Sequence, residues 1–200
     1  TLYSTLKHLA TEEVNVTTIE DPIEMIEPSF NQTQAQPQLE FGFAEGVRTL
    51  MRQDPDIIMV GEIRDLATAD MAIQAALTGH LVFSTLHTND APSAITRLIE
   101  LGVPSYLINA TLLGVLAQRL LRTLCPACRQ PDDGSQKTLL EQTIKPWSLT
   151  GEYRGYRAVG CLECRMTGYR GRTGVYELLT ISEAFKAQVT PQPNIDALRR

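Results

Sequence analysis

A chain of 200 residues with 43% hydrophobic side chains and a net charge of −5 can bury a real core, as one large domain or two small ones. Its longest apolar-rich run, Tyr106 to Leu124, includes Arg119 and Arg122. This run is a poor transmembrane candidate, because charges near a bilayer centre are costly. The first residues lack the basic and apolar regions of a signal peptide. We expect a soluble, cytoplasmic protein.

The net charge is divided unevenly along the chain. Residues 1–118 hold five basic and fifteen acidic side chains, whereas residues 119–174 hold ten basic and five acidic ones. The acidic first part argues against duplex nucleic acid as a partner, because phosphate neutralisation dominates such binding. The basic second part could face a phosphate, an anionic membrane surface or an acidic neighbouring subunit.

Hydrophobic periodicity predicts an alternation of helices and strands over the first 124 residues. The expected helices are 2–9, 44–53 with Arg48 and Arg52 on one face, 66–78 ended by Gly79, 92–101 capped by Asn89 or Asp90, and 106–124. The expected strands are 14–21, 57–60 and 81–86, the last two buried, while the Gln- and Pro-rich residues 27–39 read as an exposed loop. This order predicts an α/β fold, a mostly parallel sheet flanked by helices.

From Cys125 onward the alternation is lost, and Pro, Gly and Cys dominate. We place a domain boundary near residue 122 and divide the chain into 1–122, 123–174 and a C-terminal segment, 175–200. The middle part contains CxxC pairs at Cys125/Cys128 and Cys161/Cys164, separated by 32 residues. In a cytoplasmic chain this spacing predicts one structural, four-coordinate zinc site rather than disulfides. Trp147, Tyr153 and Tyr156 could pack the long loop between the pairs.

Acidic residues follow two of the predicted strands. Glu20, Asp21 and Glu24 end the first, and Glu62 comes two residues after the strand 57–60. Ligands of open α/β sheets bind beyond the carboxyl ends of strands, and Mg²⁺ is held through one or two carboxylates plus substrate phosphates. A further carboxylate can orient an attacking water. The alternative is that these carboxylates only cap the next helix.

Histidines and arginines complete the candidate site. His87 and Thr85 lie at the carboxyl end of the strand 81–86, where His87 could hydrogen bond a γ-phosphate, while His80 lies at its start and is more often structural. Arginines can stabilise a transferring phosphoryl group, from the same or a neighbouring subunit. The candidates are Arg48, Arg52 and Arg64, and their alternative role is salt bridging to Glu40, Asp54 or Asp56.

Four segments together resemble the type II secretion and type IV pilus assembly ATPases. TIEDPIE is similar to the Asp box of that family, RQDPDIIMVGEIRD to its Walker B region, GHLVFSTLHTND to its His box, and LGVLAQRLLRTLC to the stretch before its zinc module. The resemblance implies a RecA-like ATPase that uses ATP and Mg²⁺ in a hexameric ring. It also implies pilus or pseudopilus assembly at the inner membrane, with membrane platform and recruitment proteins as partners. The tetracysteine module favours assembly over retraction.

The resemblance also implies roles for individual residues. Glu20 and Glu62 would be the leading catalytic carboxylates, with His87 beside them and Arg48 and Arg52 as charge stabilisers between subunits. The residues expected to bind nucleotide and Mg²⁺ are Asp21, Glu24, Gly61, Arg64, His80 and Thr85.

The Walker A motif GxxxxGK(S/T) is absent from the chain, and TLYSTLKHLA resembles the helix that follows it in the family. Without the amides and lysine of that loop the phosphates lose their cradle, so we expect a fragment with little ATP hydrolysis of its own.

Two other functions stay open. A zinc-ribbon nucleic-acid binder could use the basic side chains of the second part, namely Arg154, Arg157, Arg165, Arg170 and Arg172, together with Tyr156 and Tyr169. A protein-docking module is the other alternative.

Overall fold

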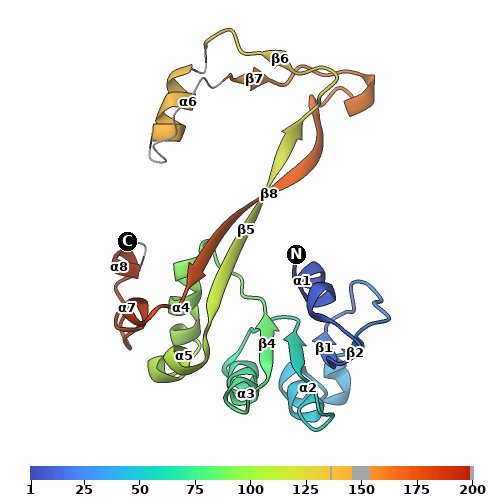
Figure 1. Ribbon diagram of the computed structural model, residues 1–200, viewed down its shortest axis with the longest axis vertical. Coiled ribbons are helices and arrows are strands. Elements are labelled where there is room, and N and C mark those ends of the chain that lie inside the picture. The colour runs from blue at the N-terminus through green and yellow to red at the C-terminus, as the bar shows by residue number, and fades with distance from the viewer. Residues whose placement is uncertain (136, 146–153, 199–200) are drawn as a thin grey trace. The chain divides into compact units, whose positions relative to one another are not determined.

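The computed structural model describes residues 1–135, 137–145 and 154–198 (Figure 1). These form two compact units, one made of Thr1–Ala117 with Glu177–Arg200 and the other of Gln118–Tyr176. We call them the sheet unit and the cysteine unit. Among the described residues no helix is long and apolar enough to cross a membrane. Trp147 and Tyr153, which the sequence suggested as packing residues, lie outside the described residues.

The sheet unit is built on four parallel strands in the order β2–β1–β3–β4. Their bounds are Val16–Glu20 for β1, Asn31–Gln34 for β2, Ile57–Val60 for β3 and Leu81–Ser84 for β4. Every residue of β1 and β3 is buried, as the unbroken apolar run of β3 predicted. The helices are α1 (Leu2–Leu9), α2 (Phe43–Leu50), α3 (Leu66–Leu77), α4 (Ala91–Glu100), α5 (Ser105–Thr111), α7 (Glu183–Lys186) and α8 (Ile195–Leu198), with a 3₁₀ turn at Pro37–Leu39.

Helices pack on both faces of this sheet, as expected. Because side chains alternate along a strand, Ile58 and Val60 face a cluster with Leu50 of α2 and Met71 of α3. Ile57 and Met59 face a second cluster with Leu6 of α1 and Phe30. A third cluster joins α3, α4 and α5 to α7 and α8.

Glycine is required where α2 crosses the sheet. A Cβ on Gly46 would stand 2.7 Å from two carbons of Ile19, closer than carbon atoms pack. At the end of α3, Gly79 has φ +102°, the left-handed C-terminal cap expected from the sequence.

Four predicted elements differ from the structure. The expected loop 27–39 contains β2, whose polar residues sit at a half-exposed sheet edge and so show no apolar alternation. Helix α2 ends at Leu50, so Arg52 lies in the following turn and shares no helical face with Arg48. Strand β4 ends at Ser84 and is partly exposed, because it has a neighbour on one side only among the described strands.

The fourth difference is the largest. The expected helix 106–124 is the short helix α5 followed by the strand β5, Gly114–Leu124. The partner of β5 is β8 (Tyr169–Thr180), far away in the sequence. A Leu-rich run with good helix propensity becomes a strand because this distant partner completes its backbone hydrogen bonds.

In its described residues the cysteine unit contains little regular structure besides its part of the β5–β8 pair. Strands β6 (Gln130–Pro131) and β7 (Tyr156–Arg157) form a two-residue antiparallel pair. The other elements described there are α6 (Lys137–Ile144) and a 3₁₀ turn at Leu162–Cys164.

Candidate active site and metal centre

The carboxyl ends of β1, β3 and β4 meet at one edge of the sheet, and hydrogen bonds continue just beyond the strands. The Gly61 amide donates to the carbonyl of Ile19 at 2.8 Å, and the Ile63 amide donates to that of Thr85 at 3.0 Å. The Thr85 hydroxyl donates to the carbonyl of Gly61 at 2.7 Å. These bonds fix the loop that carries Glu62 relative to both neighbouring strands.

Glu62 lies between two basic groups. One carboxylate oxygen accepts a hydrogen bond from Arg64, and the other lies 3.1 Å from Nε2 of His87. The Glu62 side chain is 15% exposed, whereas that of His87 is 90% exposed. The hydrogen bond from Arg64 lowers the pKa of Glu62, partial burial opposes this, and His87 lowers the pKa further. Glu62 therefore stays ionised and can accept a proton or orient a water.

Glu20 is buried and hydrogen bonded on both oxygens. Tyr3 of α1 donates to Oε2 at 2.5 Å, while Thr18 and Gln32 donate to Oε1 at 2.7 and 3.1 Å. Burial, followed by the hydrogen bond to the Glu20 carboxylate, raises the pKa of Tyr3 to about 12. The phenol therefore remains a hydrogen-bond donor at any physiological pH.

A cavity of about 230 Å³ lies at this edge of the sheet. It brings together seven residues expected from the sequence, which are Glu20, Asp21, Glu24, Gly61, Glu62, Thr85 and His87. Tyr3 and Phe43 also line it, and neither was expected there. The sequence predicted only a helix over residues 2–9, so the phenol of Tyr3 at the site was missed.

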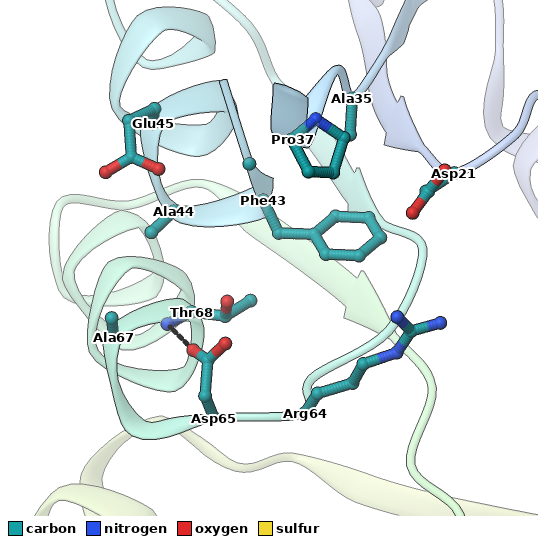
Figure 2. Close-up of a pocket in the computed structure, with 11 residues that line it drawn as sticks. Asp21, Ala35, Pro37, Phe43, Ala44, Glu45, Arg64, Asp65, Ala67 and Thr68 are labelled. Carbon is teal, nitrogen blue, oxygen red and sulfur yellow. Dashed lines mark hydrogen bonds between the residues drawn. The ribbon is translucent and has the colours of Figure 1, made fainter. Parts of the chain in front are cut away.

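A second cavity of about 270 Å³ lies between the first turns of α2 and α3 (Figure 2). Asp21 and Arg64 line it, so the predicted residue Arg64 faces this space. In Figure 2 the Phe43 ring projects into it, and Asp65 caps α3 by accepting the Thr68 amide at 2.8 Å.

Three predicted residues lie elsewhere. Arg48 and Arg52 are exposed, and neither lines either cavity. Within the described residues neither pairs with the acidic neighbours proposed from the sequence. His80 lies at the start of β4, where its Nδ1 is 2.9 Å from the Ala75 carbonyl and 3.0 Å from the Thr78 hydroxyl. This position agrees with the structural alternative for His80.

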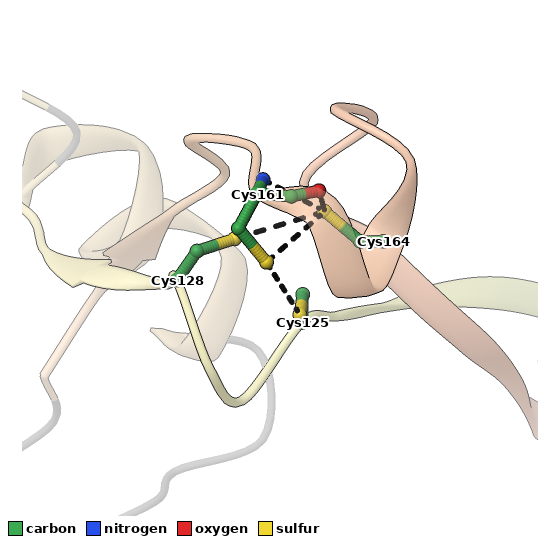
Figure 3. A group of neighbouring side chains, drawn as sticks. All are labelled: Cys125, Cys128, Cys161 and Cys164. Atoms are coloured by element: carbon green, nitrogen blue, oxygen red, sulfur yellow. Dashed lines mark hydrogen bonds between the residues drawn. The ribbon is translucent and has the colours of Figure 1, made fainter.

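The four cysteines gather in the cysteine unit (Figure 3). Cys125 and Cys161 have their sulfurs 3.9 Å apart, as do Cys128 and Cys164, and those of Cys161 and Cys164 are 3.8 Å apart. Four sulfurs at about 2.3 Å from a tetrahedral zinc ion lie about 3.8 Å from one another. The donor set and its spacing therefore fit zinc.

Backbone amides support these sulfurs. The amides of Cys161 and Gly168 each donate to Cys164 Sγ at 3.2 Å, and that of Gly160 donates to Cys128 Sγ at 3.3 Å. Burial raises the pKa of the Cys164 thiol, but the two amide donors, together with the side-chain contacts to Cys161 and Cys128, bring the pKa down to about 6. For Cys128 burial dominates and raises the pKa to about 11. The amides thus stabilise a thiolate before any metal charge is added.

The aromatic rings proposed for nucleic-acid stacking are partly covered. The Arg122 guanidinium lies 4.1 Å from the centre of the Tyr169 ring, and that of Arg129 lies 4.8 Å from the centre of the Tyr156 ring. Arg170 pairs with Glu163 at 2.9 Å. One face of each ring is therefore occupied by a cation–π contact, which leaves less surface for bases.

The fold of this chain is similar to that of a solved motor protein. The pilus retraction motor PilT with bound ADP superposes with a TM-score of 0.61 at 28% identity, over 94% of this chain and 45% of PilT. The chain is thus a RecA-like α/β domain that also carries a tetracysteine module.

More specifically, the chain belongs to the type II/IV secretion system protein family, whose model matches residues 1–200. It is 58% identical over 199 residues to the type IV pilus assembly ATPase TfpB of Acinetobacter baylyi, covering 100% of this chain and 34% of that protein. It is 48% identical over 202 residues to the type II secretion system ATPase E of Vibrio cholerae, covering 100% of this chain and 39% of that protein. The chain therefore spans less than half the length of these relatives.

Proposed function

We propose that this chain is part of an ATP-hydrolysing motor that drives assembly of a type IV pilus or a type II secretion pseudopilus. The convergence of Glu20 and Glu62 on one cavity, from two neighbouring parallel strands, carries the proposal. The similarity to a pilus assembly ATPase and a type II secretion ATPase supports the choice of cargo.

The oxygen donors at this edge suit Mg²⁺, which prefers carboxylates and water. Glu20 and Glu62 would hold the ion directly or through water, and the ion would neutralise phosphate charge. Glu62 is the better residue to orient an attacking water, because its carboxylate stays ionised and faces the cavity. Glu20 is the better anchor, because three donors hold its carboxylate in one orientation.

The remaining roles are also proposals. Asp21, Glu24, Gly61, Thr85 and Arg64 would contact nucleotide or its hydrated cation, since they line the two cavities. Arg48 and Arg52 are exposed and outside these cavities, so a charge-stabilising role requires a neighbouring subunit, as in a homo-hexamer. The motor would work in the cytoplasm against inner-membrane platform and recruitment proteins, with one structural zinc ion at the four cysteines.

The proposal is tested by assaying ATP hydrolysis in the longest protein that the gene for this chain encodes. Replacing Glu62 by Gln removes the charged carboxylate while keeping the size of the side chain, so turnover is expected to fall about 100-fold or more. Steady-state phosphate release measures this change, and Glu12→Gln, an exposed carboxylate outside both cavities, is the matched control. An unchanged turnover in Glu62→Gln would refute the assignment.

The 200 residues alone are expected to hydrolyse little or no ATP, since they contain no GxxxxGK(S/T) motif. Glu62-dependent turnover by the isolated chain would contradict this expectation.

A further inference from the structure

The buried Glu20 carboxylate receives its hydrogen bonds from three elements of the sheet unit. Tyr3 comes from α1, Thr18 from β1 itself and Gln32 from the edge strand β2. Tyr3 and Gln32 also contact each other, with Gln32 Nε2 donating to the phenol oxygen at 3.0 Å. Glu20, Tyr3 and Gln32 therefore hydrogen bond to one another in a triangle, and Thr18 adds a further donor to Glu20.

Gln32 also holds the loop that follows β1. Its Nε2 shares its two hydrogens among Glu20, Tyr3 and the Met25 carbonyl, which lies 3.0 Å away, and its Oε1 accepts the Glu27 amide at 2.7 Å. This loop begins with Asp21 and Glu24, which line the same cavity as Glu20. A single amide side chain thus connects the anchor carboxylate to the segment that carries two further carboxylates.

The chemistry of these contacts requires an amide and a phenol. The Glu20 carboxylate accepts hydrogen bonds, so a second carboxylate at position 32 would offer no donor and would add a like charge. Gln32 does not line the cavity, so it can affect a bound ion only through Glu20 and the loop. Groups that orient metal-ligating carboxylates usually matter for metal affinity.

We propose that Gln32 and Tyr3 are positioning residues, which hold Glu20 in the orientation that binds a divalent cation at the carboxyl edge of the sheet. This rests on the proposed function for the identity of the site. The two residues belong to the edge strand and the first helix, whereas the carboxylates of the cation site follow β1 and β3.

The test is a double-mutant cycle in the longest gene product, with Mn²⁺ and ADP as the probe and electron paramagnetic resonance of free Mn²⁺ as the readout. Gln32→Met keeps the length of the side chain without its donors, and Tyr3→Phe removes only the hydroxyl. Each is expected to weaken Mn²⁺ binding about tenfold. In the Glu20→Gln background the same changes should cause no further loss, because they act through Glu20.

The control is Gln34→Met, which makes the same change two residues along β2, at an exposed position whose side chain makes no hydrogen bond among the described residues. Its Mn²⁺ affinity should equal that of the wild type. In hydrolysis assays at a Mg²⁺ concentration that saturates the variant, Gln32→Met should lower kcat while the KM for ATP stays within about twofold, since the residue orients a catalytic anchor and does not bind nucleotide.

The outcomes separate this inference from the proposed function. Full losses in the Glu20→Gln background, or no loss in Gln32→Met, would overturn the positioning role even if ATP hydrolysis depends on Glu62. Coupled losses in a protein without Glu62-dependent hydrolysis would support the positioning role and refute the motor. A wild type that binds no Mn²⁺ with ADP would refute both.

Discussion

The sheet unit and the cysteine unit are stabilised by different means. In the sheet unit, apolar side chains from both faces of the sheet are buried against helices in three clusters. In the described part of Gln118–Tyr176, the buried side chains of the hydrophobic class are those of Cys125 and Cys164. A unit without an apolar core needs another source of stability, and four converging sulfurs can supply it through a metal.

The largest expected effect concerns that metal. Structural zinc contributes about 10–16 kcal/mol of binding energy in small modules, so a chelator or Cys125→Ser should unfold residues 118–176 and leave the sheet unit folded. Hydrogen exchange of the two units should show this difference, and metal analysis of the wild type should find one zinc per chain.

Val159→Ala, a truncation of a half-exposed side chain in the same unit, is the control and should retain the metal. If native protein contains no zinc and its thiols titrate freely, the cysteine unit has another source of stability and the contrast between the units fails.

The same truncation in the two units gives the next largest effect. Leu50 is 1% exposed in the cluster beneath the sheet, and Leu121 is 52% exposed on β5. Leu50→Ala should destabilise the sheet unit by about 2–5 kcal/mol, whereas Leu121→Ala should change stability by no more than about 0.5 kcal/mol. Urea unfolding curves compare the two variants. Similar losses would mean that the β5–β8 strand pair is buried against another surface in solution.

A smaller effect is expected where β8 enters the sheet unit. Glu177 accepts the amide of Ala91 at 3.0 Å, at the first turn of α4. Glu177→Gln removes a negative charge from a helix N-terminus and should cost about 0.3–1 kcal/mol. Amide exchange in the first turn of α4 should quicken. Glu100→Gln, at the other end of the same helix, should not quicken it, and equal effects would refute the local cap.

The two units also differ in how far the sequence predicts them. Four apolar residues followed by Gly61 and Glu62 predict a buried strand with a carboxylate at its end. The prediction succeeds because a strand buried on both faces has an unbroken apolar run, which can be recognised without knowing the strand's partners. The paired cysteines are equally local. Their spacing specifies a tetrahedral sulfur site whatever the loop between them does, and the structure brings the four sulfurs together.

The missed elements depend on distant partners. Strand β2 consists of Asn, Gln and Thr at a sheet edge. It is a strand because its backbone pairs with β1, and nothing in its own residues indicates that pairing. Gln32 was missed for the same reason, since a glutamine in an expected loop carries no chemical signal. Strand β5 reads as a helix until β8, which is 45 residues further along, is paired with it. The roles of Arg48 and Arg52 stay predictions, because they depend on a second subunit.

The smallest expected effect tests whether charge adds to packing in the sheet unit. Lys7 of α1 lies 2.7 Å from the buried Glu27, and this contact, aided by Ser29, lowers the pKa of Glu27. A carboxyl group with a lowered pKa in the folded state contributes stability above its unfolded pKa of about 4.3, and that contribution is lost as the pH falls through the folded value.

Lys7→Met should therefore be slightly less stable than the wild type at pH 7, with the difference closing in acid. Urea midpoints between pH 7 and pH 3 measure it. Lys145→Met, a lysine in the cysteine unit, should show no such trend, and a Lys7 difference that persists unchanged at pH 3 would assign the effect to packing of the lysine stem.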